Sequence, residues 1–123
     1  VSNFTTIFRG ELVLYEDPEE NTIGQQYATE VGKIDILAQE PSTGSFVVIE
    51  LKKGVESDKV IGQTLRYMGW VCENLCRDSQ TVKGIIICKD SDSKLEYALK
   101  MINNVKVKYY RIDFNLSDTP FSA

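Results

Sequence analysis

Residues 45–52 read SFVVIELK, and this stretch decides what kind of fold the chain adopts. It is short, rich in apolar and β-branched residues, and follows the turn sequence PSTG at 41–44, so it is typical of a β-strand. Alternate residues of a strand share a face. One face would carry Phe46, Val48, Glu50 and Lys52. The other would carry Val47, Ile49 and Leu51, and apolar residues on both faces predict a central strand.

An acidic residue inside such a strand needs an explanation. Glu50 lies within residues 45–52, and Asp35 lies in the same way within the apolar stretch 30–39, EVGKIDILAQ. An unpaired carboxylate is costly to bury, or its pKa shifts until the group is neutral. A divalent cation is one partner that would offset this cost, because Mg²⁺ binds carboxylate oxygens and keeps several waters.

The turn at 41–44 predicts an antiparallel hairpin between the strands at 30–39 and 45–52. This pairing would place Asp35 across from the strand that contains Glu50. Lys52 lies two residues after Glu50 on the same face, so its ammonium would enter the same small volume. Two carboxylates and one lysine that converge would outline a site for metal-assisted phosphodiester hydrolysis.

Simpler explanations exist for the same residues. The sequence Lys52-Lys53-Gly54 could be a solvated strand end, and Asp35 could cap a turn or form a structural ion pair with Lys33 or Lys52. The spacing of an acid and a later Glu-x-Lys also occurs by chance in many chains. What favours a metal site is the placement of both acids inside apolar strands that a hairpin joins.

The rest of the chain predicts strands that alternate with helices. Before the hairpin we expect a strand at 11–15 and a loop at 16–26. After it we expect a helix over 58–75, a strand at 84–88, a second helix, a closing strand at 105–112 and a frayed tail at 115–123. This order predicts an α/β fold with a mixed central β-sheet flanked by helices.

Each expected helix has a capping residue and an apolar stripe. Ser57 or Asp58 would cap the first helix, and Asp92 or Ser93 would cap the second. The first helix would bury the stripe formed by Ile61, Leu65, Met68, Cys72 and Leu75. The second would turn inward Leu95, Leu99 and Ile102.

Length and composition set broad limits. The 123 residues suit a single domain, 1–123, and a composition of 42% hydrophobic and 26% charged residues is ordinary for a globular protein. Neither a membrane-spanning apolar run nor a signal peptide is visible, and we expect a cytoplasmic protein. The missing initiator Met suggests a trimmed chain or an excised domain.

Charge and cysteine usage bear on partners. The net charge of -4 counts against nucleic-acid binding, although it hides local patches. The chain has three cysteines and no histidine, and the odd cysteine count together with the absence of a secretion signal favours a reducing compartment. We expect small buried thiols rather than zinc ligands at Cys72, Cys76 and Cys88.

Three motifs together resemble the NucS-type endonucleases of the PD-(D/E)xK nuclease superfamily. They are the Gly-x-IDIL sequence that ends the stretch 26–37, VVIELK at 47–52 and GQTLRY at 62–67. The resemblance covers roughly residues 24–115 and implies a restriction-endonuclease-like core. It implies that Asp35 and Glu50 bind Mg²⁺ or Mn²⁺ and that Lys52 assists catalysis. Gln63 matches an additional active-site glutamine of this group.

The resemblance also implies DNA as the partner and DNA repair as the setting. Lys53, Arg66 and Tyr67 are the expected DNA-binding residues. For Gln63 and Arg66 the alternative is a solvated helix surface, and for Tyr67 a place in the core. Stacking on bases is a further idea, with the core again the alternative, for Trp70 and the pair Tyr109-Tyr110.

One departure from the superfamily concerns the acidic residue on a helix before the first core strand. Almost nothing precedes Glu11, and Phe4 to Phe8 would be a remnant of that helix. The first acid was either lost by truncation or never present. Glu11 and Glu30 are weak substitutes, and the core is expected to lack its first helix.

Two functions therefore remain in the foreground. The first is a metal-dependent DNA endonuclease, with a homodimer as one option because enzymes that cut both strands often pair two subunits. The second is a catalytically silent nuclease-fold module for DNA binding or dimerisation. A plain α/β interaction domain with a structural ion pair at Asp35 is the third.

Overall fold

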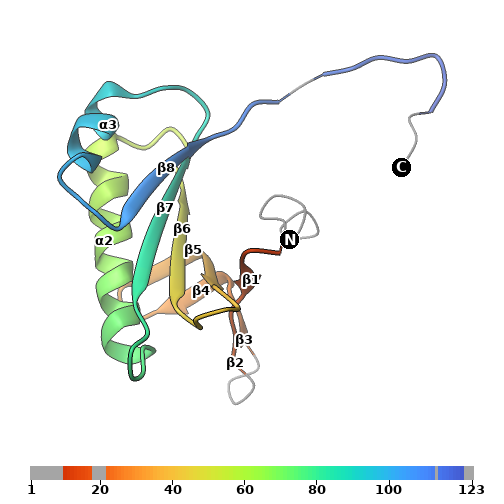
Figure 1. Cartoon of the computed structure of the whole chain (residues 1–123). Helices are drawn as coiled ribbons and strands as arrows, with labels where there is room; N and C mark the ends of the chain where they lie inside the picture. Colours follow the sequence, from red (N-terminus) through yellow and green to blue (C-terminus); the bar gives the residue numbers. More distant parts are fainter. Residues whose placement is uncertain (1–9, 18–21, 113, 121–123) are drawn as a thin grey trace.

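A six-stranded mixed sheet forms the centre of the computed structural model, which describes residues 10–17, 22–112 and 114–120 (Figure 1). The strand order is β1-β5-β6-β7-β8, with β4 also paired to β5. The bounds are β1 Val13–Leu14, β4 Gln25–Thr29, β5 Gly32–Gln39, β6 Phe46–Leu51, β7 Val82–Cys88 and β8 Val105–Tyr109. A separate two-stranded sheet pairs β2, Glu16–Asp17, with β3, Thr22–Ile23.

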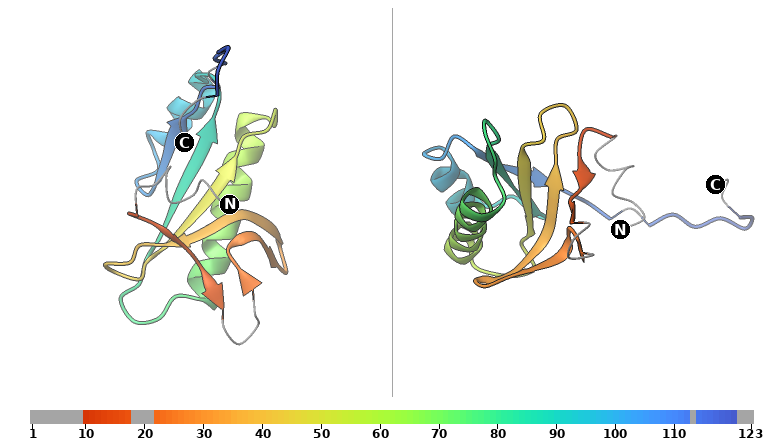
Figure 2. Two further views of the ribbon diagram at one scale, coloured as in Figure 1. Left: turned by 90° about the vertical axis from the view of Figure 1, so that its right-hand side faces the viewer. Right: turned by 90° about the horizontal axis from the view of Figure 1, so that it is seen from below.

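Strand directions follow from the connections. β5 and β6 pair antiparallel across the turn at 41–44, as the sequence predicted. β6, β7 and β8 are parallel, and each crossover contains a helix. α2, Ser57–Asn74, joins β6 to β7, and α3, Ser93–Leu99, joins β7 to β8. Both helices lie on one face of the sheet (Figure 2), so the predicted α/β fold is confirmed.

The core has two layers because β6 is apolar on both faces. The larger cluster lies between the sheet and α2 and α3 and includes Phe46 and Val48. A smaller cluster on the opposite face includes Val47 and Ile49. This division matches the alternation predicted for the strand. Within the described part of the chain, neither helix is both long and apolar enough to cross a bilayer.

The buried side of α2 differs from the stripe that the sequence predicted. Met68 of that stripe is buried, and Ile61 and Leu75 pack against the core. Leu65 is 41% exposed and Cys72 is also exposed, so the stripe was wrong at these two residues. The residues that face the sheet are Ser57, Val60, Thr64, Tyr67, Met68 and Val71. The reason is close packing on β7, where a Cβ on Gly84 would lie 2.8 Å from Met68 Sδ and 3.1 Å from Thr64 Cγ2.

The expected loop at 16–26 was also wrong. It contains β2, β3 and the start of β4, and β4 forms a hairpin with β5. Only Tyr27 is buried within β4, so the strand has little apolar alternation from which to be recognised. The hairpin turn leads into Gly32, whose φ of +126° favours glycine.

Helix capping agreed with the sequence at one helix and not at the other. Asp92 is the N-cap of α3 and accepts a hydrogen bond from Leu95 N, as expected. Leu95 is fully buried, and the other two residues of that stripe pack against the core. Glu56 takes the N-cap position of α2 without a capping hydrogen bond. Ser57 donates its hydroxyl to Asp92 instead, so neither predicted cap of α2 was right.

We predict that Gly84→Ala lowers the free energy of unfolding by about 1–3 kcal/mol, because the new Cβ must displace Met68 and Thr64. Gly69→Ala is the matched control, since Gly69 lies in α2 with open space around it. That change should stabilise the protein by about 0.5–1 kcal/mol through helix propensity. Urea unfolding measures both effects. Equal effects in the two variants would contradict the close packing of α2 on β7.

Candidate active site

The centre of the candidate site is the place where β5 and β6 stop pairing. Their ladder runs from Gln39↔Phe46 to Ile36↔Ile49 and does not continue to the next pair of residues. Beyond this point two side chains form hydrogen bonds to the main chain of the other strand. Asp35 N donates to Glu50 Oε2 at 2.7 Å, and Leu51 N donates to Asp35 Oδ2 at 2.9 Å. The two acids therefore satisfy main-chain groups that the diverging strands would otherwise leave unpaired.

Where the strands diverge, the side chains of β5 also switch from one face of the sheet to the other. Ile34 packs in the helix-side cluster, whereas Ile36 packs in the cluster on the opposite face. Residues two apart in a regular strand share a face. The strand therefore changes face between them, at Asp35. This irregularity turns the Asp35 carboxylate toward β6, as the reciprocal hydrogen bonds show.

Glu50 is the more deeply buried of the two acids, with 4% of its surface exposed. Burial raises the pKa of Glu50 to about 7, the nearby Asp35 carboxylate also raises it, and the hydrogen bond from Asp35 N lowers it. Lys53 and Arg66 lower the pKa further through their charges. Among the described residues, only Oε2 of this carboxylate has a hydrogen-bond partner. Oε1 is therefore available to a further ligand.

Asp35 lies at the mouth of the site, with 18% of its side chain exposed. Its Oδ1 lies 3.4 Å from Gln26 Nε2 and 3.9 Å from Lys53 Nζ. The ion pair is loose because the Lys53 side chain is 63% exposed. Gln26 has a φ of +52°, which is uncommon for a residue with a side chain. The contact of Gln26 with Asp35 follows from the β4–β5 hairpin, and the sequence did not predict it.

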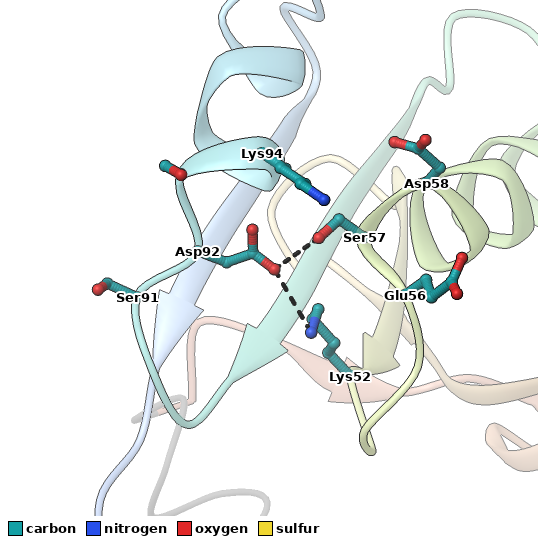
Figure 3. Close-up of a pocket in the computed structure, with 8 residues that line it drawn as sticks. Lys52, Glu56, Ser57, Asp58, Ser91, Asp92 and Lys94 are labelled. Atoms are coloured by element: carbon teal, nitrogen blue, oxygen red, sulfur yellow. Dashed lines mark hydrogen bonds and ion pairs between the residues drawn. The ribbon is translucent and has the colours of Figure 1, made fainter.

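The side chain of Lys52 points to Asp92 and not to the two carboxylates beside which the sequence predicted its ammonium. Its Nζ is 3.4 Å from Asp92 Oδ2, and Figure 3 shows the side chain directed toward Asp92 and Ser57. The lysine whose ammonium reaches Asp35 is Lys53, rather than Lys33 or Lys52. Asp92 was predicted only as a helix cap. Its second role could not be read from the sequence, because it depends on the pairing of β6 with β7.

The candidate residues on α2 divide between surface and core. Gln63 is half-buried, and Arg66 is exposed with its guanidinium 5.3 Å from the ring centre of Tyr67. Tyr67 is 6% exposed and packs in the core, which is the alternative considered for it. This burial leaves little of its ring for DNA. Trp70 also packs against the core, 6.2 Å from the ring centre of Tyr27.

The closing strand gives the remaining aromatic candidates. Tyr109 and Tyr110 are 46% and 45% exposed, so neither belongs to the core. Tyr109 donates its hydroxyl to Glu96 Oε1 at 2.5 Å, which raises the pKa of the tyrosine to about 12. This bond ties the Tyr109 hydroxyl to α3, while the residue remains partly exposed.

The donors suit a hard divalent cation of the Mg²⁺ or Mn²⁺ type. Asp35 and Glu50 offer carboxylate oxygens only, and a cation beside Glu50 Oε1 would offset the cost of charging that buried group. Across 10–17, 22–112 and 114–120, no cluster of three or more His, Cys, Asp or Glu residues is placed to hold a metal. Glu11 and Glu30 are exposed and join no such cluster. Phe4 to Phe8 lie outside the described residues.

We predict a pH-dependent stability difference between wild type and Glu50→Gln in the presence of a chelator. The pKa of Glu50 rises from 4.5 to about 7 on folding, so the folded state holds this proton more tightly. The wild-type free energy of unfolding should therefore fall, by about 3 kcal/mol from this group, as the pH rises through that interval. Glu50→Gln should lack this fall and be the more stable protein above pH 7.

Urea unfolding at several pH values tests this expectation. Glu73→Gln is the control, because Glu73 is an exposed acid on α2 and its removal should leave the wild-type pH dependence in place. Parallel pH profiles for wild type and Glu50→Gln would show that Glu50 does not pay a burial cost when charged.

Comparison with known proteins places this geometry in a family. The model of the endonuclease NucS C-terminal domain matches residues 14–118. A solved complex of EndoMS with double-stranded DNA is 16% identical, with a TM-score of 0.62, over 85% of this chain and 38% of that one. A repair endonuclease from Pyrococcus abyssi is 15% identical, with a TM-score of 0.63, over 89% of this chain and 46% of that one.

No curated protein sequence matches the chain. The chain spans less than half the length of the two solved structures. Because the identities are low, these matches show a shared fold alone. The family match is the broader result, because it extends over most of the sequence and contains β5, β6 and α2. The chain belongs to the family of NucS endonuclease C-terminal domains.

Proposed function

We propose that this chain is a metal-dependent DNA endonuclease domain that hydrolyses phosphodiester bonds with Mg²⁺ or Mn²⁺. The observation that carries the proposal is the pair of carboxylates, Asp35 and Glu50, that bind each other's main chain where β5 and β6 diverge. Membership of the NucS family supports it. So does the fold shared with a repair endonuclease and with a protein solved in complex with double-stranded DNA.

The two acids have complementary roles in this proposal. Glu50 would bind the metal through Oε1, while Oε2 keeps its hydrogen bond to Asp35 N. Asp35 would bind through Oδ1, the oxygen that faces Gln26 and Lys53, while Oδ2 keeps Leu51 N. When bound, a divalent cation lowers the pKa of a coordinated water and polarises the phosphate.

Lys52 and Gln63 complete the proposed catalytic set. Lys52 follows the last residue of β6, so its main chain lies next to the Leu51 N–H that Asp35 binds. We assign it the role of positioning the attacking water or stabilising the developing negative charge. Gln63 is half-buried on α2 and would orient the water or the scissile phosphate through its amide.

DNA would approach over the exposed cations beside the two acids. Lys53 and Arg66 are both exposed, and both lower the pKa of Glu50 through their charges, which places positive charge around this site. Phosphate contacts draw on such residues. The net charge of -4 therefore does not describe the surface near the carboxylates. We leave Tyr67 out of the DNA-binding set because it is buried.

A second candidate function is a nuclease-fold module that binds DNA without cutting it. The observation that favours it is that only two carboxylates meet at the site, with no third Asp, Glu, Cys or His placed to join them within the described part of the chain. This alternative predicts DNA binding that is independent of metal, with no cleavage of any substrate. The endonuclease predicts cleavage that a chelator abolishes.

We predict that the protein cleaves DNA with Mn²⁺ and that Glu50→Gln cuts at least about a hundredfold more slowly, because the variant loses a metal ligand. The assay compares single-stranded, duplex, mismatched and branched DNA under single-turnover conditions, with and without EDTA. Glu73→Gln is the matched control at an exposed acid of α2 and should cut like wild type. Wild-type rates in Glu50→Gln would exclude the proposed ligands, and DNA binding without any cleavage would establish the silent module.

We also predict that Lys53→Gln and Arg66→Gln each weaken DNA binding about threefold to tenfold near 0.1 M salt, since each removes one phosphate contact. Fluorescence anisotropy in EDTA measures binding without cleavage. Lys59→Gln removes an exposed charge elsewhere on α2 and serves as the control. If all three variants lose affinity equally, DNA does not approach over Lys53 and Arg66 in particular.

A further inference from the structure

Gln26 lies directly opposite Asp35 across the β4–β5 hairpin, and the proposed function has not used it. The residues on either side of these two are paired in register, whereas the ladder skips the pair Gln26 and Asp35. On the other side of β5, the ladder with β6 stops one residue short of Asp35. Asp35 is therefore skipped by both ladders, and on β4 the side chain that it meets in place of a ladder partner is that of Gln26.

The backbone of Gln26 is strained at the point where its side chain reaches the carboxylate. Its φ of +52° lies in the left-handed region, which residues with a side chain seldom adopt. The side chain is exposed, so burial in the core does not account for this conformation. What the conformation accompanies is the contact of the Gln26 amide with Asp35 Oδ1. Backbone strain beside a carboxylate in this way is typical of functional sites.

The distance between the two groups suits a shared cation. Gln26 Nε2 lies 3.4 Å from Asp35 Oδ1, which is long for a hydrogen bond between an amide and a carboxylate. A cation that holds six oxygens at about 2.1 Å in octahedral geometry keeps neighbouring oxygens about 3 Å apart. A half-turn of the amide about its last bond places Oε1 where Nε2 lies, without moving the rest of the side chain. The tip of Gln26 is therefore within reach of a cation bound to Asp35 Oδ1.

A neutral ligand also suits the charge of this site. Asp35 and Glu50 together balance a divalent cation, and within the described residues no third Asp, Glu, Cys or His joins them. Burial and the neighbouring Asp35 carboxylate already oppose the charged form of Glu50, which is why its pKa is raised. A third carboxylate would add to this repulsion. An amide oxygen is a hard donor that contributes no charge, so it can complete the ligand set without this cost.

We propose that the side-chain amide oxygen of Gln26 is a third protein ligand of the divalent cation that Asp35 and Glu50 are proposed to bind. This inference rests on the proposed function, because it concerns the same cation. Without metal, the amide donates Nε2–H to Asp35 Oδ1. With metal, it turns its oxygen inward, and three neighbouring strands, β4, β5 and β6, each contribute one ligand.

The first test measures Mn²⁺ binding by isothermal titration calorimetry in the absence of DNA. We expect Gln26→Ala to bind Mn²⁺ about tenfold more weakly than wild type. Gln26→Gly should show the same loss, and because glycine adopts a positive φ readily, this variant keeps the backbone conformation of β4. Gln25→Ala is the matched control, since it removes an amide from the adjacent exposed position and should bind like wild type. Thermal unfolding verifies that each variant retains the fold.

A count of coordinated waters separates a metal ligand from a residue that only orients Asp35. Tb³⁺ is a hard cation that takes oxygen ligands, and its luminescence lifetimes in H₂O and D₂O give the number of waters bound to it. If Gln26 is a ligand, Gln26→Ala should leave a place for about one more water. If Gln26 only donates a hydrogen bond to Asp35, the number of waters stays the same, and the inference is overturned. Gln26→Glu should bind Mn²⁺ more tightly than wild type, and weaker binding would also overturn it.

These measurements distinguish failure of this inference from failure of the proposed function. If wild type, Gln26→Ala and Gln26→Gly bind Mn²⁺ equally while Glu50→Gln does not bind it, Gln26 is no ligand and the carboxylate site stands. If wild type binds no Mn²⁺ at all, both are overturned. If wild type binds Mn²⁺ and Gln26→Ala gains a coordinated water, but no DNA is cut, the inference stands and the proposed cleavage fails.

Discussion

The hydrogen bond from the main-chain N–H of Asp35 to the carboxylate of Glu50 is the contact on which the site depends. Glu50 lies in a strand whose neighbours fill the core on both faces, and it is itself almost fully buried. β6 can contain this acid because β5 leaves the ladder at that point and presents a main-chain donor. The reciprocal bond from Leu51 N to Asp35 closes the gap from the other side. The irregularity in the sheet thus satisfies main-chain groups and gathers two carboxylates at once.

The parallel half of the sheet determines what lies beyond the carboxyl end of β6. β6 and β7 end side by side, and α2 begins shortly after β6 and α3 shortly after β7. Lys52, Ser57 and Asp92 therefore meet at the carboxyl ends of the strands, where open α/β sheets commonly bind ligands. The antiparallel half contributes Gln26 through the β4–β5 hairpin. Each half of the mixed sheet thus supplies side chains that the other cannot.

The candidate site contains two features that destabilise the fold, and favourable packing elsewhere has to offset them. Burial of Glu50 opposes its charged form, and Gln26 occupies a backbone region that side chains seldom adopt. The close approach of α2 to β7 over Gly84 is one source of compensation, since it buries Thr64, Met68 and Val71 against the sheet. Strain and uncompensated charge concentrated at one edge of a well-packed sheet are typical of functional sites.

The sequence by itself determined the mixed α/β fold, the β5–β6 hairpin, the extent of α2 and the cap of α3. These features depend on local patterns, namely apolar strands, a Pro–Gly turn and a capping aspartate. It also identified Asp35 and Glu50 as acids in apolar strands. Only the tertiary structure decided which side of α2 is buried, because that depends on the space above Gly84. Only the tertiary structure paired Lys52 with Asp92 and Lys53 with Asp35, because a lysine side chain selects its partner from groups that distant strands bring within reach.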